Sequence, residues 1–363
     1  MKSRIVRYIS RPSRSKTFLI WLAKSVNLYA FIVRKVYSIM PSDEMAIGFL
    51  GIGLPTKEVW HERLLAVRNG DQPSRERGLE NKAEKVFSEQ PSPEMAVIVS
   101  LYKSDKFLLK FIQNLERQTS LGRSEICVIS VKPTLFEMTH LKAFAKRHSN
   151  VILEFHEDRI PIYVAWNHAI GLTTAPIITN ANVDDIRSPK SLEIQIDAFK
   201  RYPWADVIYQ DVIVSYDSDA TWDELVSLGA ETHFPHVFHG ALLAGSNYPH
   251  NAPAWKRSLH EAVGLFNESY LSAADGEFWL RCSAVGKKFF KINAVHNSYY
   301  LNPEGLSSSN NAVGPTEHAK ILEDFSTQND IWMKKGSKTK SINYEAQQLS
   351  LIQTLKQLRS NLG

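Results

Sequence analysis

From about residue 95 onward, short apolar runs alternate with segments whose apolar residues recur at helical spacing, as Phe107, Phe111 and Leu115 do. The runs have the length and composition of buried strands. They lie at residues 96–102, 125–131, 151–155, 175–182 and 205–212. This alternation is typical of a mostly parallel sheet covered by helices, so we predict an α/β fold.

The distribution of polar residues divides the chain into three regions. Residues 1–94 are predicted to form an N-terminal extension with a basic, amphipathic helix and a linker, because residues 70–94 are polar and close with two prolines. Residues 95–325 hold the main domain. Residues 326–363 form a helical tail, in which leucine and isoleucine recur at three-residue spacing between Leu349 and Leu358.

The formal net charge of +5 over 363 residues is too small to indicate nucleic acid binding, and we predict none. Basic residues concentrate before Asp43, the first acidic residue, and lead into an aromatic-rich segment at 18–40. Such a segment suits an anchor in the plane of a membrane surface, although a helix packed on the main domain and a true span are alternatives. We therefore expect a cytoplasmic protein with peripheral contact of residues 1–40 at the inner face of the cell membrane.

The two cysteines, Cys127 and Cys282, lie far apart in apolar surroundings, and neither belongs to a C-x-x-C motif. They do not indicate a disulfide framework or a structural zinc site. A reducing compartment fits this usage.

Two carboxylates, Asp184 and Asp185, follow the fourth predicted strand directly. In open parallel sheets, ligands bind beyond the carboxyl ends of the strands. A hard divalent cation that is shared with phosphate oxygens would compensate two such charges, because Mg²⁺ and Mn²⁺ prefer a few carboxylates together with substrate phosphates. The alternative is that Asp185 caps a helix that starts near Pro189.

Three blocks of sequence resemble the family 2 glycosyltransferases of the GT-A fold, over roughly residues 95–308. The first is VIVSLYKSDKFLLKFIQNLERQT, which is similar to the opening strand and helix of that family. The second is AWNHAIGLTTAPIITNANVDD, which is similar to a helix, a strand and the D-x-D(D) metal motif. The third is WKRSLHEAVGLFNESYLSAADGEFWLRCSAVGKKFFKI, which is similar to the acceptor-side block. The resemblance implies a nucleotide-binding, mixed, mostly parallel sheet flanked by helices, with helical extensions at both ends of the chain.

The resemblance also implies a nucleotide-sugar donor held with Mn²⁺ or Mg²⁺. Its donor-side residues would be Tyr102, Arg159, Asn167, Asn182 and Asp184. Asn182 stands where the family usually has aspartate, so the metal would depend on Asp184 with Asp185 close by. Ser130 and Val131 replace the Asp-Asp pair that helps hold the nucleobase, which leaves uridine, thymidine and guanosine donors open.

Asp275 aligns with the family's catalytic base, because AADGEFWLR matches the end of the E-D-x-x-x-W-x-R motif. A sugar hydroxyl is a poor nucleophile at neutral pH, so a positioned carboxylate must accept its proton. Asp275 could instead cap a helix, because Phe278, Cys282 and Val285 follow it at helical spacing. Glu277 is the next candidate for the base.

Further candidates are weaker. Trp255, Arg257 and Glu277 are expected on the acceptor side, although Trp255 could equally be core and Arg257 a solvated charge. The histidines at 233, 236, 239 and 250 flank a predicted acceptor loop, and their irregular spacing does not match a zinc site. The resemblance offers His296 as a third metal ligand.

We therefore expect an inverting glycosyltransferase that acts on a saccharide or lipid-linked acceptor, in bacterial surface polysaccharide assembly. A non-catalytic scaffold or partner subunit of the same fold is one alternative, since Asn182, Ser130 and Val131 lack the family's charges. A nucleotidyltransferase is another, but the residues after the first strand offer no glycine-rich phosphate loop.

Overall fold

The computed structural model describes residues 57–69, 92–229, 231–232, 234, 237, 243, 247–307, 309 and 312–328. The helix expected at 18–40, most of the predicted linker and the predicted tail helix lie outside these residues, as do the histidines at 233, 236 and 239. Within the described part of the chain, every helix is too short or too polar to cross a membrane.

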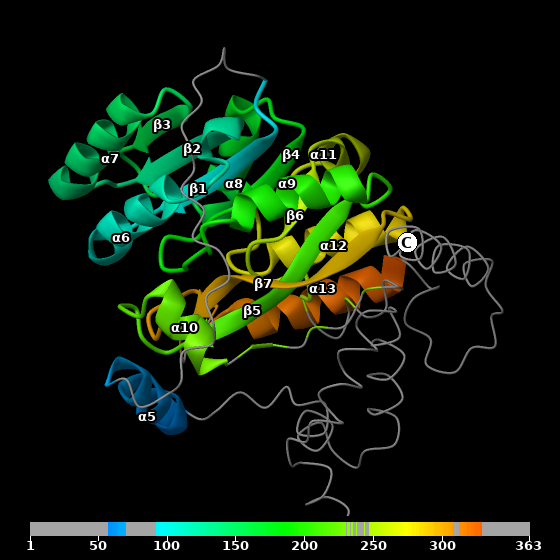
Figure 1. Cartoon of the computed structure of the whole chain (residues 1–363). Coiled ribbons are helices and arrows are strands. Elements are labelled where there is room, and N and C mark those ends of the chain that lie inside the picture. The colour runs from blue at the N-terminus through cyan, green and yellow to red at the C-terminus, as the bar shows by residue number, and fades with distance from the viewer. Residues whose placement is uncertain are drawn as a thin grey trace, which may run out of the picture.

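The described strands form one seven-stranded sheet in the order β3-β2-β1-β4-β6-β5-β7 (Figure 1). Its strands are β1 Met95–Leu101, β2 Ser124–Val131, β3 Val151–His156, β4 Ile177–Asn180, β5 Val207–Ser215, β6 Ala254–Lys256 and β7 Phe289–Tyr300. Neighbouring strands run parallel except at β6, which is antiparallel to both β4 and β5. The mixed, mostly parallel sheet confirms the predicted fold class.

Helices cover both faces of this sheet. One face packs against α6 Asp105–Glu116, α7 Leu135–Arg147 and α9 Ser191–Arg201. The other packs against α8 Ile162–Leu172, α11 Ser258–Val263, α12 Ala274–Ala284 and α13 Gly314–Gln328. The described helices also include α5 Lys57–Arg68, α10 Trp222–Leu228 and the short 3-10 turn Leu121–Arg123.

Apolar spacing explains why these segments are helical. In α6, four apolar residues at helical intervals from Leu108 to Leu115 are buried. Helix α7 begins with a capping box. The Thr134 side chain accepts a hydrogen bond from the Glu137 N–H, and the Glu137 carboxylate accepts one from the Thr134 N–H. In α12, Phe278 and Cys282 are buried, whereas Val285 is the C-cap residue and is exposed.

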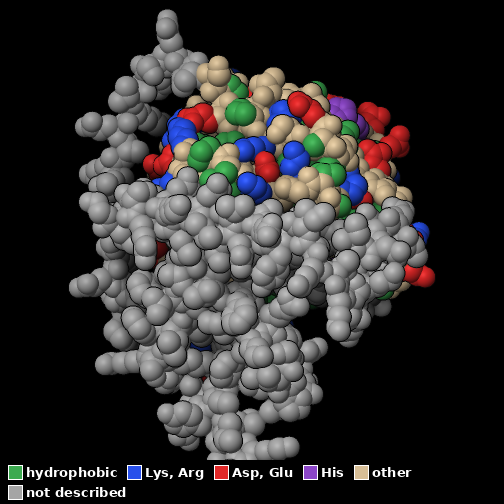
Figure 2. Space-filling model, turned by 90° about the vertical axis from the view of Figure 1, so that its right-hand side faces the viewer, with side chains coloured by type: hydrophobic (Ala, Val, Ile, Leu, Met, Phe, Trp, Pro, Cys, Tyr) green, Lys and Arg blue, Asp and Glu red, His purple; other side chains and the backbone are tan. Residues whose placement is uncertain are grey.

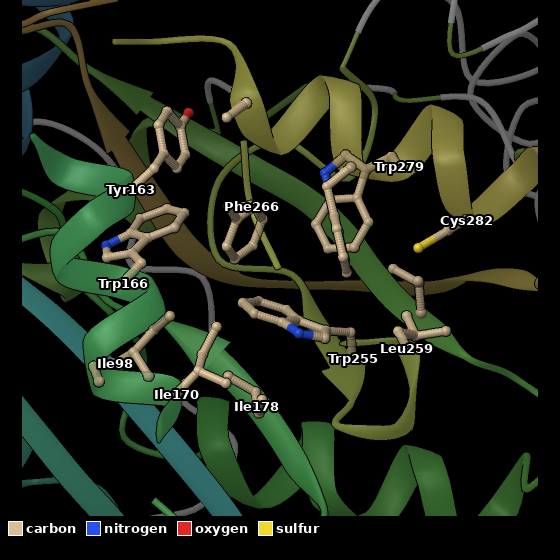
Figure 3. Packing of buried hydrophobic residues seen from close by; sticks show 14 of the residues in the cluster. Ile98, Tyr163, Trp166, Ile170, Ile178, Trp255, Leu259, Phe266, Trp279 and Cys282 are labelled. Carbon is tan, nitrogen blue, oxygen red and sulfur yellow. The ribbon is translucent and has the colours of Figure 1, made fainter. Parts of the chain in front are cut away.

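Aromatic rings fill the core beside α8 and α12 (Figure 3). Trp255 has no exposed surface, and its ring centroid lies 5.6 Å from that of Trp279 and 5.9 Å from that of Phe266. Tyr163 and Trp166 of α8 contact Phe266 from the other side. This cluster fixes α8 and α12 relative to each other.

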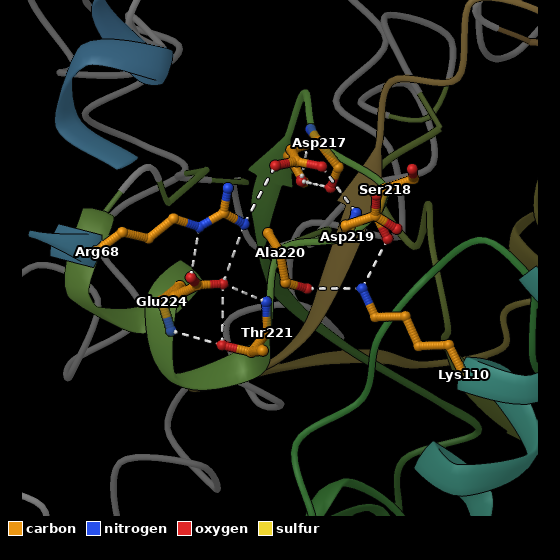
Figure 4. A network of polar contacts seen from close by, with 9 residues as sticks. Arg68, Lys110, Asp217, Ser218, Asp219, Ala220, Thr221 and Glu224 are labelled. Carbon is orange, nitrogen blue, oxygen red and sulfur yellow. Dashed lines mark hydrogen bonds and ion pairs between the residues drawn. The ribbon is translucent and has the colours of Figure 1, made fainter. Parts of the chain in front are cut away.

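Helix α5 belongs to the predicted N-terminal extension, yet it packs against β5 and α10. Trp60 is fully buried, and its indole N–H donates to the Val214 carbonyl at 3.1 Å. Arg68 forms an ion pair with Glu224 at 2.6 Å, and Lys110 donates to two carbonyls in the adjoining turn (Figure 4). On the described part of the face shown in Figure 2, basic and acidic side chains are interspersed.

Replacing Trp60 by alanine should lower the free energy of unfolding by about 3 kcal/mol or more, because it removes a fully buried indole and its hydrogen bond. Denaturant unfolding of the full chain measures this. Leu65→Ala is the matched control, since Leu65 lies on the same helix and is 58% exposed. If Trp60→Ala, like Leu65→Ala, leaves the free energy of unfolding nearly unchanged, α5 does not contribute to the stability of the main domain.

Candidate active site

Two carboxylates follow β4, and they have different surroundings. Asp185 is buried, whereas Asp184 is half-buried. Asp184 accepts a hydrogen bond from the Asn302 side chain at 3.0 Å. Helix α9 has Lys190 at its N-cap, so Asp185 is not the cap of that helix.

Asp185 is the centre of a buried hydrogen-bond network. One carboxylate oxygen accepts from the Tyr300 N–H at 2.8 Å, and the other accepts from the Asn182 side chain at 2.9 Å. Asn182 also donates to Asn251 at 3.2 Å, and Asn251 donates to the Ser298 carbonyl at 2.7 Å. The network therefore joins the end of β4 to the 247–251 loop and to β7.

Burial raises the pKa of both carboxyls. The pKa of Asp185 is raised to about 8, with the Asp184 charge adding to the effect of burial. The pKa of Asp184 is raised by burial, while the hydrogen bond from Asn302 acts in the opposite direction. A bound divalent cation would favour the ionised form of both groups, so their chemistry fits a hard metal ion at this edge of the sheet.

Asp275 lines a pocket of about 430 Å³ on the α8 and α12 side of the sheet. Its carboxylate accepts from the Tyr163 hydroxyl at 3.0 Å and from the Asn247 side chain at 2.6 Å. Burial raises the pKa of Asp275, and the hydrogen bonds from Asn247 and Tyr163 act in the opposite direction. Asn182 lines the same pocket, so the pocket connects Asp275 with the residues after β4.

The Tyr299 phenol is influenced by the carboxylates of both regions. It lines the pocket, and burial raises the pKa of its phenol, with the charges of Asp185, Asp184 and Asp275 adding to the effect. All three carboxylates therefore act on one phenol, although only Asp275 of the three lines this pocket.

Asp275 does not cap α12. Ala273 is the N-cap residue and makes no side-chain cap bond, and Asp275 lies in the first turn. Glu317 of α13 instead accepts the backbone N–H groups that lead into the helix, at 2.7 Å from Leu271, 2.8 Å from Ser272 and 3.0 Å from Ala273. The Asp275 carboxylate thus remains directed toward Tyr163 and Asn247.

The structure brings two of the donor-side candidates together and places a third elsewhere. The Arg159 guanidinium lies 4.9 Å from the centroid of the Tyr102 ring, beyond the carboxyl ends of β3 and β1. Asn167 is buried and bonds the Phe266 backbone through both its donor and its acceptor, and it also donates to Glu268. Asn167 therefore secures the loop after α11.

The acceptor-side candidates all have protein partners. Trp255 lies in the core, as the packing alternative requires. Arg257 donates to the Ala175 and Ile170 carbonyls, each at 2.7 Å, at the end of α8. Glu277 forms a two-pronged ion pair with Arg281 at 2.7 and 2.9 Å. We leave these three residues out of the site that we propose below.

His296 lies on β7, and its Nδ1 atom is 3.0 Å from the Ser188 hydroxyl. Burial lowers its pKa to about 4. In the described part of the chain, His296 does not join Asp184 and Asp185 in a group of three close ligand atoms. His250, from the predicted acceptor loop, lines the pocket.

Four described non-glycine residues, after β1, after β2 and beside Asn251, have a left-handed backbone conformation. Lys103 and Lys132, which follow β1 and β2, have φ of 53° and 49°. His250 and Ala252 have φ of 42° and 57° and flank Asn251. Such backbone costs about 1–2 kcal/mol per non-glycine residue and occurs preferentially at functional sites.

Sequence reasoning missed the neutral side chains that hold the carboxylates, namely Tyr163, Asn247, Asn251 and Asn302. Their partners lie 28 to 118 positions away along the chain. The available signal was the concentration of asparagine and proline at 247–253, inside the predicted acceptor loop.

Residues 96–259 match the model of glycosyl transferase family 2. The chain is similar to the solved structure of S. aureus TarS residues 1–349 in complex with UDP, with 14% identity over 72% of this chain and 79% of that one and a TM-score of 0.45. It is also similar to the mannosyltransferase PcManGT from Pyrobaculum calidifontis in complex with GDP-Man and Mn²⁺, with 15% identity over 83% of this chain and 82% of that one and a TM-score of 0.47. The sequence matches no curated protein.

Replacing Glu317 by alanine should lower the free energy of unfolding by about 1–2 kcal/mol, because three backbone N–H groups before α12 lose their acceptor. Denaturant unfolding measures this, with Lys320→Ala as the control because Lys320 is exposed on the same helix. Glu317→Gln keeps an acceptor oxygen and should recover part of the loss. An alanine variant as stable as the control would mean that Glu317 does not hold α12.

Proposed function

We propose that this chain is a glycosyltransferase, because residues 96–259 match the model of glycosyl transferase family 2, and that it moves a sugar from a nucleotide-sugar donor to an acceptor hydroxyl with inversion at the anomeric carbon. The observation that carries the proposal is the position of Asp275. Its carboxylate lines a pocket that also contains Asn182, two residues from Asp184.

Asp275 is the proposed base. The acceptor oxygen attacks C1 of the donor sugar, the bond from C1 to the diphosphate oxygen breaks, and the hydroxyl proton passes to the Asp275 carboxylate. Hydrogen bonds from Tyr163 and Asn247 fix the direction of that carboxylate, and its raised pKa makes it a stronger proton acceptor than an exposed aspartate. Glu277 is engaged with Arg281, which disfavours it as the base.

Asp184 and Asp185 are the proposed holders of Mn²⁺ or Mg²⁺, with Asp184 as the more accessible ligand. The metal, when bound, would neutralise charge on the leaving diphosphate. Tyr102 and Arg159 together offer an aromatic face and a cation beyond β1 and β3, which suits a nucleobase and a phosphate. The identity of the base and of the sugar stays open.

Both polar and apolar side chains line the proposed acceptor side of the pocket. Asn247, His250 and Ser272 offer neutral hydrogen-bonding groups, which suit sugar hydroxyls. Leu271 and Leu306 also line it and are 47% and 50% exposed. A saccharide with an apolar neighbour, such as a lipid-linked intermediate of surface polysaccharide assembly, fits this lining. Contact of residues 1–40 with a membrane surface would bring such an acceptor close.

Asp275→Asn should reduce turnover by about 10²-fold or more and leave donor affinity nearly unchanged, because an amide keeps the hydrogen bonds but cannot accept the proton. Turnover, donor dissociation constant and Tm are measured on one preparation.

In the wild type, turnover should fall as pH is lowered through the raised pKa of Asp275, because the protonated acid is inactive. This acid limb should lie above the ordinary aspartate pKa of about 3.9.

Glu277→Gln is the control for this test, since it removes a nearby carboxylate from the same helix. It should lower Tm through loss of the Arg281 pair and leave most of the turnover. If the glutamine variant loses turnover and the Asp275 variant keeps it, Glu277 is the base. Wild-type protein that binds donor but transfers sugar to no acceptor would favour the non-catalytic alternative.

Asp184→Asn should weaken metal-dependent donor binding by about tenfold or more, because a carboxylate ligand to a hard cation becomes a neutral amide. Donor titrations with and without Mn²⁺ measure this, and the fold is checked by Tm. Asp105→Asn is the control, as an exposed aspartate after β1. Donor affinity that responds to Mn²⁺ equally in both variants would remove Asp184 from the metal site.

A further inference from the structure

A second cluster of metal-binding side chains lies away from Asp184 and Asp185. Glu154 and His156 are two residues apart on β3, so their side chains project from the same face of this edge strand. His168 approaches them from α8. One potential ligand atom from each of the three lies within 4.8 Å of the others.

The contacts within the cluster are short. His156 Nε2 lies 3.2 Å and His168 Nε2 lies 3.0 Å from the two oxygens of Glu154. The two imidazole rings meet edge to face, with centroids 5.3 Å apart. Both Nε2 atoms therefore face the same carboxylate. Ligand atoms around a tetrahedral zinc ion, at bonds of about 2.0–2.2 Å, are separated by roughly 3.3 Å, so the spacing is close to that of a metal site.

The surroundings of His156 Nε2 also bear on metal binding. The atom is buried, and despite its 3.2 Å distance from Glu154 it makes no hydrogen bond with any described residue. A buried polar atom without a hydrogen bond is costly. A metal ion between the three side chains would satisfy it, because a neutral imidazole nitrogen is a metal ligand.

We propose that Glu154, His156 and His168 bind a divalent transition metal ion of the zinc type. Two imidazoles and one carboxylate form a donor set that suits Zn²⁺, whereas Mg²⁺ prefers oxygen ligands alone. The site is thus chemically distinct from the Asp184 and Asp185 pair. With three ligands from the chain, one coordination position is left for water.

The position of the cluster indicates a structural role for the metal. His156 is the last residue of β3, three positions before Arg159, and His168 shares α8 with Tyr163. Metal bonds across the cluster would clamp the edge strand to the helix that orients Asp275. The bound ion would therefore raise the stability of β3 and α8.

Co²⁺ titration of chelator-treated full-length protein tests the site, because Co²⁺ bound to nitrogen and oxygen ligands absorbs visible light and Zn²⁺ displaces it. We expect one equivalent to produce visible bands, Zn²⁺ to abolish them, and Zn²⁺ to raise Tm. His168→Ala should weaken Zn²⁺ binding by at least about tenfold. His156→Gln serves the same purpose if the alanine variant does not fold.

Two controls separate this site from other metal-binding groups. His140→Ala removes a histidine on α7, and Asp184→Asn alters the proposed Mn²⁺ site. Both variants should keep the Co²⁺ bands and the Zn²⁺ affinity of the wild type. The proposal is overturned if the wild type shows no bands, or if His168→Ala and His156→Gln bind Zn²⁺ as tightly as the wild type.

Discussion

The buried carboxylate of Asp185 is the constraint on which the geometry of the sheet edge after β4 depends. An ionised carboxylate in that position is costly, so burial raises the pKa of Asp185 to about 8 even though its oxygens accept hydrogen bonds from Tyr300 and Asn182. Arg187, also buried, adds a positive charge that acts on Asp185. The carboxylate can hold its place only when β4 and β7 are both in position.

Apart from the 247–251 loop, Asp275 is held by other elements than Asp185. Tyr163 reaches it from α8, Asn247 from the loop before β6, and Glu317 of α13 fixes the start of its helix. The two halves of the proposed site therefore share the 247–251 loop, through Asn251 and Asn247, and otherwise depend on different elements. A substitution that loosens α13 should affect the base and leave the residues after β4 in place.

The strands β1 to β5 were predictable because buried parallel strands require unbroken apolar runs. The carboxylates at the end of β4 were predictable for a related reason, since polar residues stand out after such a run. Strand β6 has three residues, too few for any pattern, and β7 pairs with β5 through irregular register. Nothing in the sequence distinguishes a fully buried Trp255 from one that contacts a ligand.

The neutral partners of the carboxylates were not predictable. Tyr163 and Asp275 are 112 positions apart, and a tyrosine in an aromatic-rich helix has the same sequence signature whether or not its hydroxyl bonds a carboxylate. The same holds for the asparagines at 251 and 302. Arg257 looked like a surface or acceptor charge, but the end of α8 uses its guanidinium to bind carbonyls.

The order in which the chain is made gives the β7 contacts a further consequence. Tyr300 and Ser298, which complete the Asp185 network, are synthesised more than one hundred residues after the carboxylate that they hold. A nascent chain that has emerged only as far as β6 already contains Asn182, Asp184 and Asp185, yet it lacks the backbone groups that fix them. The edge that carries Asp184 and Asp185 therefore cannot reach its final geometry until β7 has left the ribosome and paired with β5.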